Sequence, residues 1–247
     1  MKWRRRLWVA RNIAKHEGWS RLLGGVLRSF RPAPRSTTVD EIRLVFNALN
    51  ASQQSGFLID VGAHYGGSLS RFAHHGWDVW AFEPDSVNRQ SLVQRFGRHS
   101  NVSIDARAVA DEPAQSAAFY RSEESSGISG LSAFHESHAH SNQVEITTLS
   151  SVLDNKPPPR PVIDILKIDT EGFDLKVLLG VPWDRYPPRV VLCEFEDRKT
   201  IPLDYNYDDL ATFLLARGYR VIVSEWFPIQ QFGGPHDWRC FAVYPHQ

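Results

Sequence analysis

The sequence predicts an α/β protein of the doubly wound class, with a mostly parallel sheet, an antiparallel last strand and a basic helical arm at the N-terminus. Short apolar runs alternate with helix-like segments, which is typical of parallel strands buried on both faces. The last two apolar runs are joined by a loop with Gly and Pro and can therefore pair antiparallel. A turn with glycines follows the first strand, where sheets of this class bind ligands.

Length and charge divide the chain into an arm and one domain. The 247 residues are 42% hydrophobic, which is enough for one sizeable core. The net charge of zero carries no nucleic-acid signature. However, residues 1–35 hold ten Lys or Arg and one Glu, a net of +9, which leaves 18 basic against 27 acidic residues in the remainder. We expect a basic helical arm with its linker at 1–36 and the main domain at 37–247.

The composition of the arm leaves its partner open. Tryptophans among arginines suit an anionic membrane surface, and they equally suit packing on the acidic body of this chain or of a second copy in a homodimer. No apolar run approaches the ~20 residues of a membrane span, and the start lacks the long apolar segment of a secretion signal. Two cysteines, Cys193 and Cys240, make no disulfide framework. The expected location is the cytoplasm, with peripheral contact to the membrane as an open alternative.

The periodicity assigns elements in order along the domain. A helix over 39–49, with Thr38 as its N-cap, precedes the alternation. Gly218 ends the last helix. The predicted strands are 56–62, 77–84, 101–109, 162–172, 189–196, 219–227 and 239–245, with extended segments at 117–120 and 144–154 and helices at 68–75, 86–96, 174–179 and 208–217.

The turn after the first strand reads "IDVGAHYGGS" from residue 59 to residue 68. A dinucleotide fingerprint would be G-x-G-x-x-G, but from Gly62 the chain reads Gly-Ala-His-Tyr-Gly-Gly, without the second glycine. This disfavours a nicotinamide-dependent oxidoreductase. S-adenosylmethionine has no phosphate and fits better, because backbone N–H groups can meet its carboxylate and Asp60 its cationic or polar donors. Glu83, about twenty residues on, can accept both ribose hydroxyls.

Four segments resemble, in order and spacing, the motifs of the FkbM-family methyltransferases: "FLIDVGAHYGG", "WAFEPDSVN", "NVSIDARAVAD" and "DILKIDTEGFDLKVLLG". The resemblance covers about residues 55–245. It implies a class I methyltransferase fold with seven strands, the last antiparallel, and methyl transfer from S-adenosylmethionine to an oxygen of a sugar or polyketide-type product. His64 stands where the family often has Asn. By position the resemblance implies Asp60, Gly62 and Gly66 at the methionine part, with His64 beside them, Glu83 at the ribose, and Ala108 and Val109 near the adenine.

Carboxylates follow two later strands. Asp169 and Glu171 are two residues apart, as are Glu194 and Glu196, so each pair lies on one side of an extended strand. Asp169 and Glu171 are the candidate catalytic residues, because a positioned base must take the proton of an acceptor hydroxyl. The same carboxylates could bind Mg²⁺, or could simply pair with surface Lys and Arg. No metal ligands are assigned.

Two further segments attract attention. His135, Glu136, His138 and His140 could bind zinc, but their spacing fits no strong metal pattern and the segment reads as a loop. The serine- and glycine-rich stretch 125–132 could close over the ligands as a lid.

The sequence thus predicts an S-adenosylmethionine-dependent O-methyltransferase that acts on a hydroxyl of a sugar, a polysaccharide precursor or a natural product. A methyltransferase of nitrogen or of a lipid-linked acceptor would share the cofactor residues. A non-catalytic binding module with the same fold is the alternative from another class, and the presence of Asp60, Glu83 and Asp169 argues against it.

Overall fold

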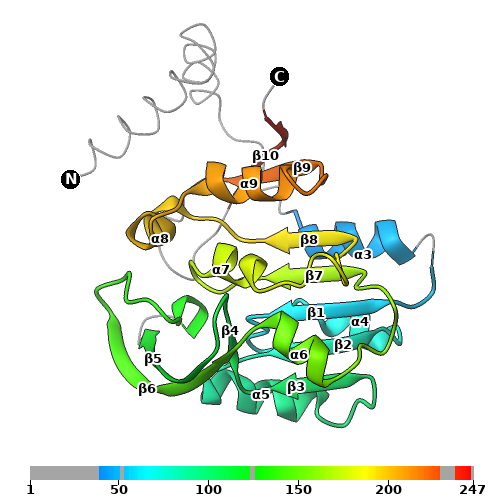
Figure 1. Ribbon diagram of the computed structural model, residues 1–247, viewed down its shortest axis with the longest axis horizontal. Coiled ribbons are helices and arrows are strands. Elements are labelled where there is room, and N and C mark those ends of the chain that lie inside the picture. The colour runs from blue at the N-terminus through cyan, green and yellow to red at the C-terminus, as the bar shows by residue number, and fades with distance from the viewer. Residues whose placement is uncertain (1–38, 51–52, 123–125, 229–236, 246–247) are drawn as a thin grey trace, which may run out of the picture.

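The computed structural model describes residues 39–50, 53–122, 126–228 and 237–245 (Figure 1). The predicted arm, its helix and the Thr38 cap lie outside these residues. Helix α3 (Glu41–Asn50) begins the described domain, and the Asp40 carboxylate accepts a hydrogen bond from the backbone N–H of Arg43 at its first turn. Within the described segments, none of the helices has the length and apolar character to cross a bilayer.

A five-stranded parallel sheet forms the centre of the domain (Figure 1). The chain runs from the central strand outward to one edge and then returns to build the other edge, which confirms the predicted doubly wound α/β class. The point where the order reverses lies between β1 and β7, and their carboxyl ends border the usual ligand crevice of such sheets. In spatial order the strands are β3 (Val102–Asp105), β2 (Asp78–Phe82), β1 (Phe57–Val61), β7 (Ile165–Ile168) and β8 (Val190–Cys193).

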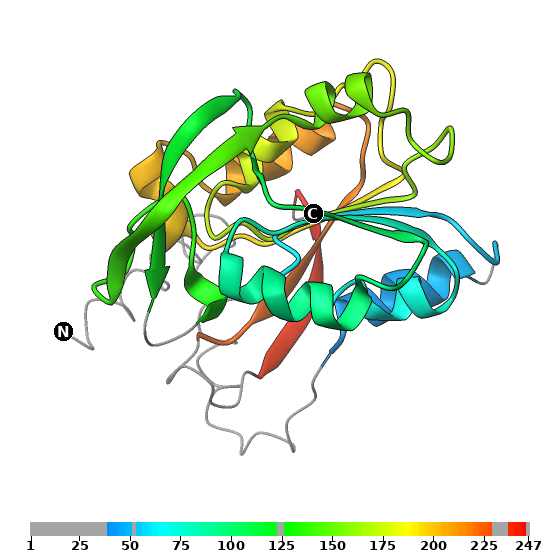
Figure 2. The same ribbon diagram turned by 90° about the horizontal axis from the view of Figure 1, so that it is seen from below.

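Helices cover both faces of this sheet (Figure 2). Side chains alternate along each strand, so β1 sends Phe57 and Ile59 to one face and Leu58 to the other. The first face packs against α6 (Leu149–Asn155), α7 (Asp174–Leu179) and α9 (Tyr207–Leu215). The second face packs against α3, α4 (Ser70–His74) and α5 (Ser86–Phe96). Both cores extend to the strand ends and hold the loops there.

The last two strands pair antiparallel as predicted, but they form a sheet of their own. Strand β9 (Val221–Trp226) pairs with β10 (Trp238–Tyr244), and in the described chain the five-stranded sheet ends at β8. The expected continuous seven-stranded sheet is therefore divided into five strands and two. The pair is tied to the domain start, because Glu41 accepts hydrogen bonds from Ser224 and Trp226.

The chain between β3 and β7 forms a small mixed sheet, which was predicted only in part. Its order is β4 (Ala108–Val109), β6 (His138–Thr147) and β5 (Ala114–Ser122), and η1 (Ser126–Ile128) lies between β5 and β6. The predicted strand 101–109 is interrupted because the Asp105 carboxylate binds the backbone and guanidinium of Arg107. The segment predicted as a histidine loop is largely β6.

The extended segment predicted over 144–154 was wrong in its second half, where α6 begins. Thr148 caps this helix, since its hydroxyl accepts a hydrogen bond from the N–H of Ser151. Two short helices complete the domain: α8 (Asp197–Thr200) and η2 (Ile201–Leu203) follow β8.

Candidate active site

The turn after β1 is shaped by one glycine that no other residue can replace easily. Gly62 has φ +76°, and a Cβ atom there would lie 1.9 Å from the backbone oxygen of Asp169. The N–H groups of Gly62 and Ala63 both donate to the carbonyl oxygen of Phe82. The backbone ends of β1, β2 and β7 therefore meet at this turn.

A buried ion pair supports the turn from below. Asp60 on β1 and Lys167 on β7 are register partners, and the Lys167 ammonium lies 3.1 Å from Asp60 Oδ1 and donates to the Gly62 carbonyl at 2.8 Å. Ser68 also donates to Asp60, whose side chain has no exposed surface. Asp60 is thus engaged inside the protein, and any contribution it makes to cofactor binding must act through the turn.

Glu83 closes the end of β2 and faces the same turn. Its two carboxylate oxygens accept hydrogen bonds from the backbone N–H groups of His64, at 2.7 Å, and Asp85, at 2.8 Å. These bonds favour the ionised form, but burial outweighs them and raises the pKa of Glu83 to about 7. A carboxylate oxygen has a second lone pair, so Glu83 can still accept from a ligand.

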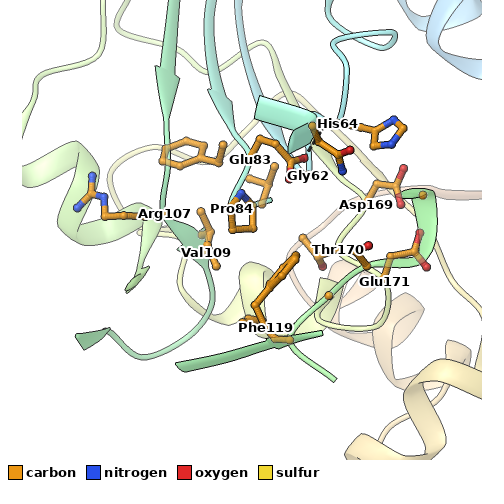
Figure 3. A pocket seen from close by; sticks show the side chains of 18 of the residues that line it. Gly62, His64, Glu83, Pro84, Arg107, Val109, Phe119, Asp169, Thr170 and Glu171 are labelled. Atoms are coloured by element: carbon orange, nitrogen blue, oxygen red, sulfur yellow. Dashed lines mark hydrogen bonds between the residues drawn. The ribbon is translucent and has the colours of Figure 1, made fainter. Parts of the chain in front are cut away.

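A pocket opens above these strand ends (Figure 3). In that view Arg107 and Val109 lie to one side of Glu83, and Asp169 and Glu171 lie to the other. Seven of the nine predicted site residues line this pocket: Gly62, His64, Glu83, Ala108, Val109, Asp169 and Glu171. Asp60 lies beneath it. Gly66 is absent from the lining, and a Cβ there would collide with the Phe96 ring, at 2.5 Å, so its role is to let α5 approach.

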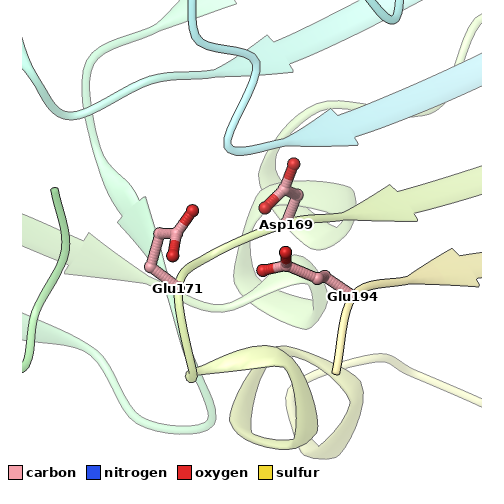
Figure 4. A group of neighbouring side chains, drawn as sticks. All are labelled: Asp169, Glu171 and Glu194. Carbon is pink, nitrogen blue, oxygen red and sulfur yellow. The ribbon is translucent and has the colours of Figure 1, made fainter. Parts of the chain in front are cut away.

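Three carboxylates gather beyond the ends of β7 and β8, and two of them, Asp169 and Glu171, line the pocket (Figure 4). Asp169, Glu171 and Glu194 each place an oxygen within 4.8 Å of the others. Asp174 stabilises the turn that carries the first two, because its carboxylate accepts a hydrogen bond from the Thr170 hydroxyl. Burial raises the pKa of Glu171, and the nearby charge of Glu194 adds to this effect, whereas the Lys199 ammonium beside it opposes the shift.

The predicted lid segment touches the glycine turn. The Ser126 hydroxyl lies 3.0 Å from His64 Nε2 and 2.7 Å from the Tyr65 hydroxyl, and four further residues of 127–131 line the pocket. His64 has φ +50°, an unusual value for a residue other than glycine, and burial lowers the pKa of its ring. The strained residue therefore directs its side chain to a segment that lines the pocket.

Asn88 leaves a buried acceptor atom in the pocket wall open to a ligand or to water. Asn88 lines the pocket with 2% of its surface exposed, and its Oδ1 has no hydrogen-bond partner in the described structure. A buried acceptor without a partner is costly unless a ligand or water satisfies it. Glu83 directly follows β2 and Asn88 lies in the first turn of α5, so both can meet a ligand that donates through hydroxyl or amino groups.

The predicted histidine segment does not form a metal centre in the described residues. His135 Nδ1 lies 2.7 Å from the Ser137 hydroxyl, and His138 Nε2 lies 2.7 Å from the Ile128 carbonyl oxygen. His135 and His138 are therefore engaged in hydrogen bonds within the protein. Among the residues that the structure describes, the one group of side chains placed to hold a cation is formed by Asp169, Glu171 and Glu194.

Sequence reasoning missed two lysines of the site. Lys167 could have been found, because a lysine inside the short apolar run "DILKID" must be paired when the strand is buried. Lys199 gives no such signal, since it stands among charged residues on a short helix after β8. Asn88 was equally hidden, because an asparagine in the first turn of a helix usually faces solvent.

The doubly wound sheet, the glycine turn and the acidic residue after β2 fit the class of S-adenosylmethionine-dependent methyltransferases. The family described as "Methyltransferase FkbM domain" matches residues 60–221, and the chain belongs to this family. It is therefore a methyltransferase enzyme with S-adenosylmethionine as its cofactor. The comparison with curated proteins gives no match.

The solved structures that match this chain include other methyltransferases. Precorrin-6y C5,15-methyltransferase from Geobacter metallireducens is 14% identical, with 80% of this chain and 81% of that chain covered and a TM-score of 0.41. Precorrin 8W decarboxylase from Methanobacterium thermoautotrophicum is 16% identical, with coverage of 85% and 89% and a TM-score of 0.42. An rRNA methylase from Streptococcus thermophilus is 11% identical, with coverage of 81% and 95% and a TM-score of 0.40.

Proposed function

We propose that this enzyme transfers the methyl group to a hydroxyl of a sugar, a polysaccharide precursor or a natural product. One observation carries the proposal: Glu83, suited to a ribose, and the carboxylates Asp169 and Glu171, suited to a hydroxyl acceptor, line the same pocket. The acceptor is thus a small molecule or a glycan that enters beside the end of β7.

The residues around Glu83 fit the cofactor. Glu83 would accept the two ribose hydroxyls, and the partnerless Oδ1 of Asn88 would accept a further donor. Ala108 and Val109 would form the apolar wall against the adenine. The turn at Gly62 and His64 would hold the methionine part, next to Asp169.

S-adenosylmethionine supplies a methyl group bound to a positively charged sulfur. Asp169 lies on the acceptor side, with a side chain 43% exposed, so it can accept a hydrogen bond from an acceptor hydroxyl. Its carboxylate can take the hydroxyl proton, which makes the oxygen a better nucleophile. Lys167, whose ammonium lies 3.5 Å from Asp169 Oδ2, restrains the carboxylate in this position.

The acceptor can be identified directly. Extracts incubated with the enzyme and S-adenosylmethionine labelled in the methyl group should yield a labelled small molecule or glycan. Its methyl group should be an ether that survives mild base. A label on nitrogen, or on a lipid-linked product, would replace the proposed acceptor class and leave the assignment as a methyltransferase intact.

The pKa of Glu83 predicts how cofactor binding depends on pH. Hydroxyl donors stabilise the ionised carboxylate, whereas the free protein protonates Glu83 below about pH 7. Affinity for S-adenosylhomocysteine should therefore fall as the pH decreases through 7, and should be about tenfold weaker at pH 6 than at pH 8. Calorimetric titration over this range measures the effect.

The Glu83→Gln variant is the control for this titration. It keeps the shape and removes the ionisable group, so its affinity should be weaker at pH 8 by about 1.5–3 kcal/mol and should lose the contribution of residue 83 to the pH dependence. The amino acid part of the ligand titrates equally with both proteins and cancels in the comparison. Identical pH profiles for the two proteins would show that Glu83 does not bind the ribose.

A further inference from the structure

A buried ammonium group lies among the carboxylates at the acceptor end. The Lys199 ammonium is 2.6 Å from Glu171 Oε2, 2.8 Å from Glu194 Oε2 and 3.2 Å from Glu196 Oε2. Its side chain is only 5% exposed, and the ring of Phe134 lies 5.7 Å away. A single lysine is thus in contact with three carboxylates that follow the ends of β7 and β8.

The turn after β7 is shaped to admit this lysine. Gly172 has φ +109°, and a Cβ atom there would lie 3.2 Å from the backbone oxygen of Lys199 and 3.3 Å from its Cβ. The preceding residue, Glu171, has φ +57°, a conformation that costs a non-glycine residue about 1–2 kcal/mol. Two successive left-handed residues therefore bring the turn close to α8 and place the Glu171 carboxylate on the ammonium.

The same carboxylates would otherwise attract a divalent cation. Oxygens of Asp169, Glu171 and Glu194 lie within 4.8 Å of one another, and Mg²⁺ prefers such ligands at about 2.0–2.1 Å in an octahedral arrangement. The Lys199 ammonium, however, already contacts two of these three residues. A metal ion bound there would have to displace a buried ammonium or tolerate its charge at close range, so the residues do not fit Mg²⁺ while Lys199 is in place.

We propose that Lys199 is the resident cation of this carboxylate cluster and occupies the position that a divalent metal would need. Lys199 is a positioning residue: it holds Glu171 and Glu194, whereas Asp169 pairs with Lys167. Asp169 is thereby left to face the acceptor. The proposal rests on the proposed function for the statement that the cluster faces the acceptor, but the occupancy of the site can be tested without any acceptor.

The test measures Mn²⁺ binding by electron paramagnetic resonance, with Mn²⁺ alone as the probe. Wild-type protein should bind no stoichiometric Mn²⁺ in the submillimolar range. Lys199→Ala should bind one Mn²⁺ per chain at least tenfold more tightly than wild type, and adding Glu171→Gln to this variant should abolish the gain. A merely structural lysine would not create a metal site when removed.

Lys176→Ala is the matched control, because it removes a lysine paired with Asp111 at 3.1 Å, outside the cluster. It should bind Mn²⁺ no better than wild type. Stoichiometric binding to wild type that Glu171→Gln removes would overturn the proposal, as would a folded Lys199→Ala variant without Mn²⁺ binding. If circular dichroism shows that Lys199→Ala does not fold, the comparison of Mn²⁺ binding by wild type and by Glu171→Gln still tests the proposal. A wrong acceptor class would leave all these binding results unchanged.

Discussion

Asp169→Asn should lower kcat about 10²-fold or more and leave cofactor affinity within a few-fold of wild type. The substitution keeps the shape of the side chain and removes its charge, so the acceptor hydroxyl loses the group that takes its proton. Stabilising the cofactor's positive charge alone would not accelerate the reaction, because that charge disappears as the methyl group leaves. Steady-state kinetics combined with calorimetric titration of S-adenosylhomocysteine separate the two effects.

Asp111→Asn provides the comparison for this variant. Asp111 also pairs with a lysine, at 3.1 Å, but it is absent from the pocket lining. Its kcat should stay near the wild-type value. If Asp169→Asn instead turns over normally and binds the cofactor much more weakly, Asp169 is a cofactor ligand and the base must be sought elsewhere.

Gly62→Ala should destabilise the fold by about 3–5 kcal/mol, because the strain of a left-handed residue adds to a steric conflict in a packed site. The added Cβ would meet the backbone oxygen of Asp169 at 1.9 Å, and a backbone atom cannot rotate away. Since the whole stability of a domain is about 5–15 kcal/mol, the loss should be obvious in urea denaturation. Any folded fraction should also have lost activity, because Asp169 must move.

Gly76→Ala separates the two causes of that loss. Gly76 has φ +75°, nearly the same as Gly62, but a Cβ there would have no atom within 4 Å. Only the conformational cost of about 1–2 kcal/mol should remain. Equal losses in the two variants would mean that the turn relaxes, and that the close approach of β1 and β7 contributes little to stability.

The parallel strands were predictable because each is a short apolar run bounded by polar residues. Strands of the small mixed sheet were not, because β6 contains His138, Ser141 and Asn142 and lacks a clear alternation. Helix α6 was missed for a related reason. The β-branched residues before it extend the strand pattern, and only the Thr148 cap marks the change to helical spacing at Leu149 and Val152.

Residues of the candidate site were predictable where the residue type and its position at a strand end together indicate one role. Glycine at Gly62 and a carboxylate at Glu83 and Asp169 follow from strand ends and chemistry. The role of Asp60 could not be read in the same way, because its partner Lys167 lies 107 positions later and meets it only through the strand register. The role of Lys199 was still harder to predict from the sequence, because its contact with Glu171 depends on the backbone conformation of the turn at Glu171 and Gly172.

The division of the pocket between two kinds of structure has a consequence for how such enzymes diversify. Its cofactor end is built by the ends of β1, β2 and β4, whereas the lining segment 126–131 belongs to an insertion that runs from β5 to β6, between β4 and α6. Residues can be added, lost or exchanged in that insertion without breaking a hydrogen bond of the five-stranded sheet. Selection for new acceptors can therefore act on the insertion alone, so relatives with the same chemistry should differ there in length before they differ anywhere else around the pocket.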